Sequence, residues 1–180
     1  MRRLLPASLL LTLLAAACSE TVAVIPCPGS PVATFQFTNA PLTLARCDSG
    51  GPAAGMNALY PATVSFTGTV SYAASGNVAA LCNIHPGAEP LVGTQVADQL
   101  DLALGTRGAL LSGCNAACAV TVQQRVTGTL LRDPGGAPSG FTGELVDEQK
   151  QDPAVPAADC SPCGTPCQAR YALTGLPVGP

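Results

Sequence analysis

The chain has 180 residues, of which only 11% are charged, against roughly 25% in a typical soluble domain. Its formal charge is −3, and no cluster of lysine or arginine follows the first 17 residues, so a nucleic-acid partner is not expected. Hydrophobic residues reach 47%, yet only 4% of residues are aromatic and tryptophan is absent. We therefore expect one domain whose core is built largely from small and β-branched side chains.

The first 17 residues, MRRLLPASLLLTLLAAA, are typical of a secretory signal peptide. Arg2 and Arg3 form its positive start, and an apolar run follows from Leu4 to Ala17. This run is too short for a permanent transmembrane helix, which needs about 20 apolar residues. We therefore expect residues 1–17 to be removed during export, and the loss of two arginines changes the formal charge from −3 to −5.

Residues 14–18 read Leu-Ala-Ala-Ala-Cys and resemble the lipobox of bacterial lipoproteins, in which small residues precede an acylated cysteine. The resemblance implies cleavage before Cys18, a thioether-linked diacylglycerol on its sulfur, and often a further acyl chain on its amino group. Ala15 departs from the pattern, because leucine is commoner at that position. The alternative is an ordinary signal peptide that ends in an Ala-x-Ala site and is followed by cysteine.

The expected location follows from this resemblance. The protein is expected in the cell envelope, with membrane lipid as its partner through acylated Cys18. Ser19 stands where lipoproteins retained at the inner membrane commonly have aspartate. The outer membrane is therefore favoured in a Gram-negative host.

The cysteine count also favours an exported, oxidised chain. Nine cysteines leave one thiol to be explained, and lipid on Cys18 leaves eight that can form four disulfides. For the dense group at residues 160–167, a zinc site or a redox Cys-x-x-Cys is the alternative. Disulfides are favoured because the compartment is oxidising, although the spacing does not fix their connectivity. The disulfide candidates are Cys27, Cys47, Cys82, Cys114, Cys118, Cys160, Cys163 and Cys167.

Strand-like alternation of apolar and polar residues dominates the mature chain. Residues 18–34 are rich in proline and lack a helical period, so they are expected to form an extended, lipid-attached linker before a single domain at 35–180. Residues 63–72 alternate cleanly, and residues 77–82 follow through a short turn that indicates a hairpin. Further strands are predicted at Phe35–Phe37, Leu42–Leu44, Leu100–Leu104 and Tyr171–Leu173, although residues 97–104 are also compatible with a helix.

Residues 120–131 and 140–147 are predicted to form an antiparallel hairpin across the turn-rich DPGGAPSG segment. Alternation places one apolar face inward, and Gln124 interrupts that face, so it should lie near an edge or find a hydrogen-bond partner. A repeated apolar-Thr-Gly-polar-apolar pattern places Gly68, Gly128 and Gly143 inside strands, where glycine usually marks a bulge or close packing. The predicted inward residues are Val120, Val122, Val126 and Leu130.

These patterns predict an all-β fold, either an antiparallel β-sandwich or a small barrel, rich in loops and stapled by disulfides. Aperiodic spacing of the repeat argues against a solenoid or propeller. Val64, Phe66, Val70 and Tyr72 are expected on one face of their strand, because side chains alternate along a pleated strand.

Few residues are candidates for catalysis or metal binding. His85 is the only histidine, and its Pro-Gly neighbours indicate a turn, while no G-x-S-x-G motif supplies a nucleophile. The carboxylates Asp147, Glu148 and Asp152 follow a predicted strand and read as a solvated turn, without the spacing of a calcium loop. Asp98 and Asp101 form a second acidic pair. No metal site and no cofactor are expected.

The sequence favours a membrane-anchored envelope lipoprotein with a structural or binding role and no catalytic activity. One alternative is a secreted hydrolase that uses carboxylates, and another is a β-sandwich module that binds carbohydrate or mediates adhesion. A deep pocket with two converging carboxylates would favour the hydrolase. A flat, exposed sheet face that carries tyrosine would favour the carbohydrate or adhesion module, with a glycan or protein as partner.

Overall fold

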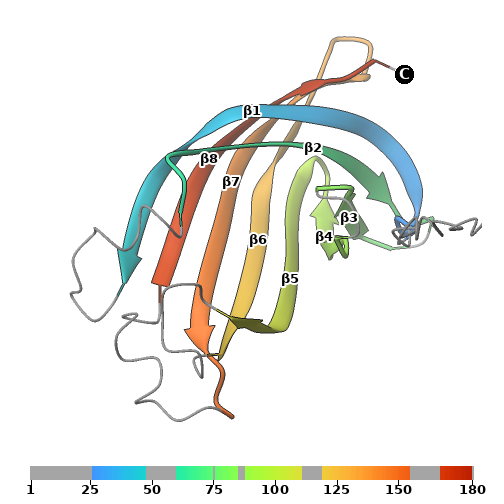
Figure 1. The fold of residues 1–180 in the computed structure, drawn as a ribbon. Helices are drawn as coiled ribbons and strands as arrows, with labels where there is room; N and C mark the ends of the chain where they lie inside the picture. The colour runs from blue at the N-terminus through green and yellow to red at the C-terminus, as the bar shows by residue number, and fades with distance from the viewer. Residues whose placement is uncertain are drawn as a thin grey trace, which may run out of the picture.

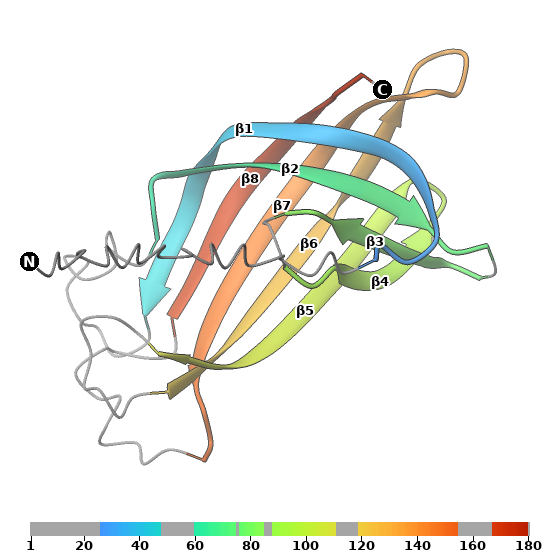
Figure 2. The ribbon, with the colours of Figure 1, turned by 45° about the vertical axis from the view of Figure 1, so that its right-hand side comes forward.

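The computed structural model describes residues 26–47, 60–74, 76–84, 88–110, 119–154 and 167–179. Eight antiparallel strands close into one barrel, in which each strand pairs with its sequence neighbours and β8 returns to β1 (Figures 1 and 2). This confirms the expected all-β class and selects the barrel over the sandwich. The strands are β1 (Ser30–Cys47), β2 (Thr63–Tyr72), β3 (Val78–Cys82), β4 (Leu91–Val96), β5 (Gln99–Leu110), β6 (Ala119–Arg132), β7 (Pro138–Gln151) and β8 (Cys167–Pro177).

Several strand predictions are confirmed, and two boundaries are corrected. β2 and the β2–β3 hairpin lie where alternation placed them, and residues 99–104 are strand, not helix. β1 begins at Ser30, so residues 30–34, expected in the linker, belong to the barrel wall. The chain between Phe37 and Leu42 remains strand because a bulge with Asn39 at positive φ accommodates the interruption.

The hairpin of β6 and β7 is confirmed, with an unbroken register from Val120↔Gln151 to Leu131↔Gly140. Val120, Val126 and Leu130 are buried inside the barrel, and Val122 on the same face is partly buried. Gln124 interrupts this face and donates a hydrogen bond from Nε2 to Asp147 Oδ2 at 3.2 Å. The prediction of a partner for this glutamine is therefore correct.

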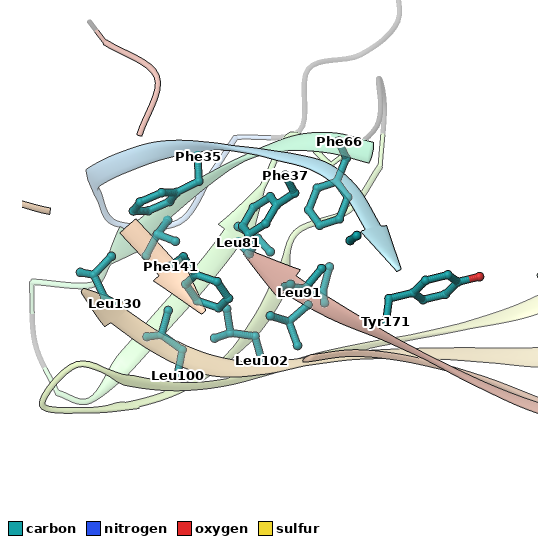
Figure 3. Close-up of a cluster of buried hydrophobic side chains, with 14 of the residues drawn as sticks. Phe35, Phe37, Phe66, Leu81, Leu91, Leu100, Leu102, Leu130, Phe141 and Tyr171 are labelled. Atoms are coloured by element: carbon teal, nitrogen blue, oxygen red, sulfur yellow. The ribbon is translucent and has the colours of Figure 1, made fainter. Parts of the chain in front are cut away.

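Aromatic rings and leucine side chains pack together inside the barrel (Figure 3). The ring of Phe37 stacks on Phe66 with centroids 4.6 Å apart and meets Phe141 edge-on at 5.5 Å. Gly128 and Gly143 are register partners, and a methyl group on Gly128 would collide with the ring of Phe141. The repeated glycines at these two positions thus make room for an aromatic core.

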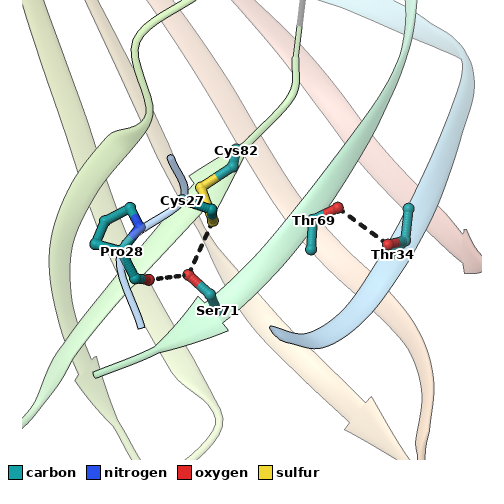
Figure 4. Close-up of a disulfide and its surroundings, with 6 residues drawn as sticks. All are labelled: Cys27, Pro28, Thr34, Thr69, Ser71 and Cys82. Carbon is teal, nitrogen blue, oxygen red and sulfur yellow. Dashed lines mark hydrogen bonds between the residues drawn. A yellow bond between two sulfur atoms is a disulfide. The ribbon is translucent and has the colours of Figure 1, made fainter. Parts of the chain in front are cut away.

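A disulfide fastens the N-terminal segment to the outside of the barrel (Figure 4). Cys27 and Cys82 are bonded with Cα atoms 5.7 Å apart, and Ser71 Oγ donates a hydrogen bond to the carbonyl of Pro28. This segment covers β2 and β3, which explains why Ser71 is fully buried although its neighbours Val70 and Tyr72 point inward.

The structure describes only some of the other cysteines that were predicted to form disulfides. Cys167, at the start of β8, is also disulfide-bonded. The side chain of Cys47 is outside the described part of the structure, as are Cys18, Cys114, Cys118, Cys160 and Cys163. Within the described ranges, the chain has no helix with the length and apolar character needed to cross a bilayer.

Candidate ligand-binding cavity

The side chains that face the barrel interior become more polar toward the end where β2 begins and β7 ends. Along β6 the inward residues run from Val126 to Gln124, and along β7 from Leu145 to Asp147, so polar groups replace the apolar core. A cavity of about 190 Å³ lies in this region, beyond Phe66. Its wall consists of Tyr60, Pro61, Val64, Ser65, Phe66, Ile84, Gln124, Val126, Leu145, Asp147 and Tyr171.

Asp147 is the only carboxylate among the described residues of the cavity wall. Burial raises the pKa of its carboxyl group above the usual range, and the nearby side-chain amides of Gln124 and Gln149, which favour the ionised form, offset this only in part. Oδ2 accepts the bond from Gln124, whereas Oδ1 is shielded from solvent and has no hydrogen-bond partner among the described residues. A carboxylate oxygen in this state is poorly solvated and open to a donor.

Tyr60 supplies the second unsatisfied group. Its side chain is 3% exposed, and its hydroxyl has no hydrogen-bond partner in the described parts of the chain. Burial, and then the negative charge of Asp147, raise the pKa of Tyr60 far above neutral pH, so the phenol stays protonated. Tyr171 Oη donates to the carbonyl of Pro61 at 3.1 Å and thereby holds the segment before β2 against the barrel.

The basic side chains that form ion pairs are partly exposed to solvent. Four such pairs occur within the described residues, and Asp147 takes part in none of them. The acidic partners are Asp98, Asp101, Glu144 and Glu148, bonded to Arg132, Arg125, Arg170 and Lys150 respectively. The charge inside the cavity wall is therefore not balanced by any of these cations.

Strand alternation splits the acidic cluster that the sequence suggested. Asp147 points inward and Glu148 outward, because β7 continues to Gln151 instead of ending at Val146. Asp152 does lie in a turn, where its Oδ1 accepts a hydrogen bond from the amide of Ala154. The prediction of a solvated turn is thus wrong for the first two residues, and these two carboxylates cannot converge on one bound molecule.

The aromatic residues lie mostly inside the barrel. All four phenylalanines are buried, as are Tyr60 and Tyr171, while Tyr72 is half-buried. An exposed sheet face with tyrosine, which a carbohydrate or adhesion module would use, is therefore not formed by these residues. Within the described residues no group of three or more potential metal ligands is gathered, and His85 lies outside them.

The cavity contains residues that sequence reasoning missed. Tyr60 precedes the first clear alternation of β2, and Ile84 follows β3, so neither belongs to a periodic segment. For Asp147 a signal was present, since the period-two series Phe141, Gly143, Leu145 reaches it directly. The polar run Asp-Glu-Gln-Lys-Gln-Asp-Pro is typical of a loop, so the continuation of the strand through Asp147 was not predicted.

Fold and cavity together define a class: an antiparallel, up-and-down β-barrel of eight strands with a partly apolar, partly polar interior space. An eight-stranded barrel is just wide enough to be filled by side chains or to hold one small ligand. Here the described side chains fill one end, and a cavity lies among the described residues toward the other. No family model, curated protein or solved structure matches the chain.

Proposed function

We propose that the protein is a membrane-anchored lipoprotein of the cell envelope whose barrel binds a small ligand without transforming it chemically. The observation that supports the binding role is the cavity in which Tyr60 Oη and Asp147 Oδ1 are both shielded and unpaired. Buried polar groups in proteins are nearly always hydrogen-bonded, because leaving one unpaired costs about 1–3 kcal/mol. A bound molecule would satisfy both groups.

The shape of the site also favours binding over catalysis. A hydrolase of the carboxylate type needs two carboxyl groups facing one substrate, and Asp147 faces the cavity without its neighbour Glu148. The apolar remainder of the wall, including Val126 and Leu145, suits the body of a compact organic molecule. An apolar cavity of about 150 Å³ already holds benzene, which sets the scale of the expected ligand.

The anchoring part of the proposal rests on the lipobox resemblance at residues 14–18 and on the odd cysteine count. Acylated Cys18 would place the barrel at a membrane surface outside the cytoplasm, with Ser19 favouring the outer membrane. The disulfide between Cys27 and Cys82 supports an oxidising compartment, because such bonds are rare in reducing cytosol.

Binding can be tested with benzyl alcohol, a neutral single-ring probe, by ligand-observed NMR and calorimetry on the mature protein in detergent micelles. Protein-free micelles serve as the blank. Val64→Phe should narrow the cavity and weaken binding about tenfold or more, since Val64 lies in the wall. Val92→Phe adds the same bulk on the exposed outside of β4 and should leave binding unchanged. Equal binding of the probe by both variants would overturn the proposal, as would failure of every single-ring probe, neutral or charged, to bind.

A further inference from the structure

We propose that the ligand is a small organic cation, whose protonated amine lies against Asp147 and whose apolar body fills the space beside Phe66 and Val126. This inference rests on the proposed binding function and specifies its ligand class. It follows from the number and type of unsatisfied groups in the wall, from the distribution of charge around the barrel, and from the size of the cavity.

The unsatisfied groups are both able to accept hydrogen bonds. An ionised carboxylate only accepts, and a phenol oxygen accepts through its lone pairs while its hydrogen stays available. Gln124 already supplies a donor to Asp147 Oδ2, which leaves Oδ1 as the free acceptor. An ammonium group carries three donors and no acceptor, so it matches the two acceptors Asp147 Oδ1 and Tyr60 Oη, whose residues line the same cavity.

The distribution of charge around Asp147 also favours a cationic ligand. Among the described residues, the groups packed around Asp147 inside the barrel are neutral, namely the amides of Gln124 and Gln149 and the phenols of Tyr60 and Tyr171. Glu148 adds negative charge on the outer face, where it is paired with Lys150. An ionised ligand of positive sign would compensate a carboxylate that no described cation pairs with, whereas an anion would add a second negative charge to a poorly solvated site.

Size and wall chemistry limit the rest of the molecule. The space of about 190 Å³ is close to that needed for one six-membered ring with a short substituent. Phe66 and Val126 are buried beside it and offer apolar contact, with Leu145 partly buried between them and Asp147. A π-face such as that of Phe66 or Tyr171 also attracts cations. Long or branched amines would not fit.

Three probes of equal shape and different charge test this inference: benzylamine, which is protonated at neutral pH, benzyl alcohol and benzoate. Calorimetry on the mature protein in micelles should rank benzylamine first and benzoate last. Asp147→Asn should weaken benzylamine binding about tenfold or more while changing benzyl alcohol binding little. Glu144→Gln removes a carboxylate from the outer face of the same strand and should alter neither affinity.

The outcomes separate this inference from the function on which it rests. If benzyl alcohol binds as tightly as benzylamine, or Asp147→Asn binds benzylamine like the unchanged protein, the cationic ligand class is wrong. In that case sensitivity of benzyl alcohol binding to Val64→Phe would still support a ligand site. If none of the three probes binds, both proposals fall, and ordered water would be the expected partner of the unsatisfied groups.

Discussion

Asp147 places a charge among described wall residues that are otherwise apolar or neutral, and this charge should lower the free energy of unfolding. Its pKa is raised in the folded state, so the folded protein binds a proton more readily than the unfolded chain does. The ionised form therefore destabilises the fold at neutral pH, and this penalty disappears as the pH falls through the raised pKa. Binding of a cation would remove the same penalty at neutral pH.

Asp147→Asn should accordingly raise the Tm of the ligand-free protein by a few degrees at neutral pH, because it removes the buried charge but keeps the shape. The gain should shrink as the pH is lowered and the unchanged protein becomes protonated. Glu144→Gln, which breaks only a surface pair with Arg170, should shift the Tm by less. Thermal melts over a pH series measure this, and a lower Tm for Asp147→Asn at neutral pH contradicts it.

At the scale of the strand, β6 shows how side-chain alternation separates core from surface. Leu130 is buried beside Phe141, while its neighbour Thr129 points outward from the barrel. Leu130→Asp should therefore lower the free energy of unfolding by more than about 3 kcal/mol, since it buries an unpaired carboxylate. Thr129→Asp should change it by less than about 1 kcal/mol. Urea denaturation measures both free energies of unfolding. A larger loss of stability for Thr129→Asp than for Leu130→Asp would mean that the inward and outward faces of the strand are reversed.

The same alternation explains which strands could be predicted from the sequence. β2, β5 and β6 each present one apolar and one polar face, so their pleat is visible in the residue order. β4 was not predicted, because its six residues contain Gly93 and place only Leu91 in the core. Its identity as a strand depends on pairing with β3 and β5.

Barrel closure could not be predicted, because alternation shows that one face is buried but not what covers it. The choice depends on β1, which pairs with β2 and with β8 and bends at the bulge near Asn39. The candidate cavity could not be predicted from the sequence either. It joins Tyr60 to Asp147, residues far apart in sequence that come together only after closure.

For the whole molecule, the bond between Cys27 and Cys82 should be a major source of stability. It joins residues 55 positions apart and so restricts the unfolded chain considerably. Replacement of both cysteines by alanine should lower the free energy of unfolding by about 2–4 kcal/mol, measured by urea denaturation without reductant. Addition of reductant should then destabilise the double variant less than the unchanged protein. Equal stability of the two proteins would show that the bond contributes nothing.

Anchoring is a second property of the whole molecule. Cys18→Ala should abolish acylation, because the cysteine sulfur is the proposed acceptor of the lipid. The variant should leave the membrane fraction and lack acyl mass in mass spectrometry, whereas Ser19→Ala should remain acylated. A Cys18→Ala protein that still carries acyl groups would contradict the proposed anchor. Stable attachment requires more than one acyl chain, so partial acylation should give reversible binding.

The position of the disulfide has a consequence for how an anchored barrel would face its surroundings. Cys18 and Cys27 are nine positions apart in the sequence, which limits the tether to about 30 Å. Cys27 lies beside the last residues of β2, whereas the cavity lies beside the first, and a strand of ten residues spans about 33 Å. With lipid on Cys18, the filled end of the barrel would be held close to the bilayer. The cavity end would then be free to turn toward the aqueous phase and to capture solutes that are not dissolved in the membrane.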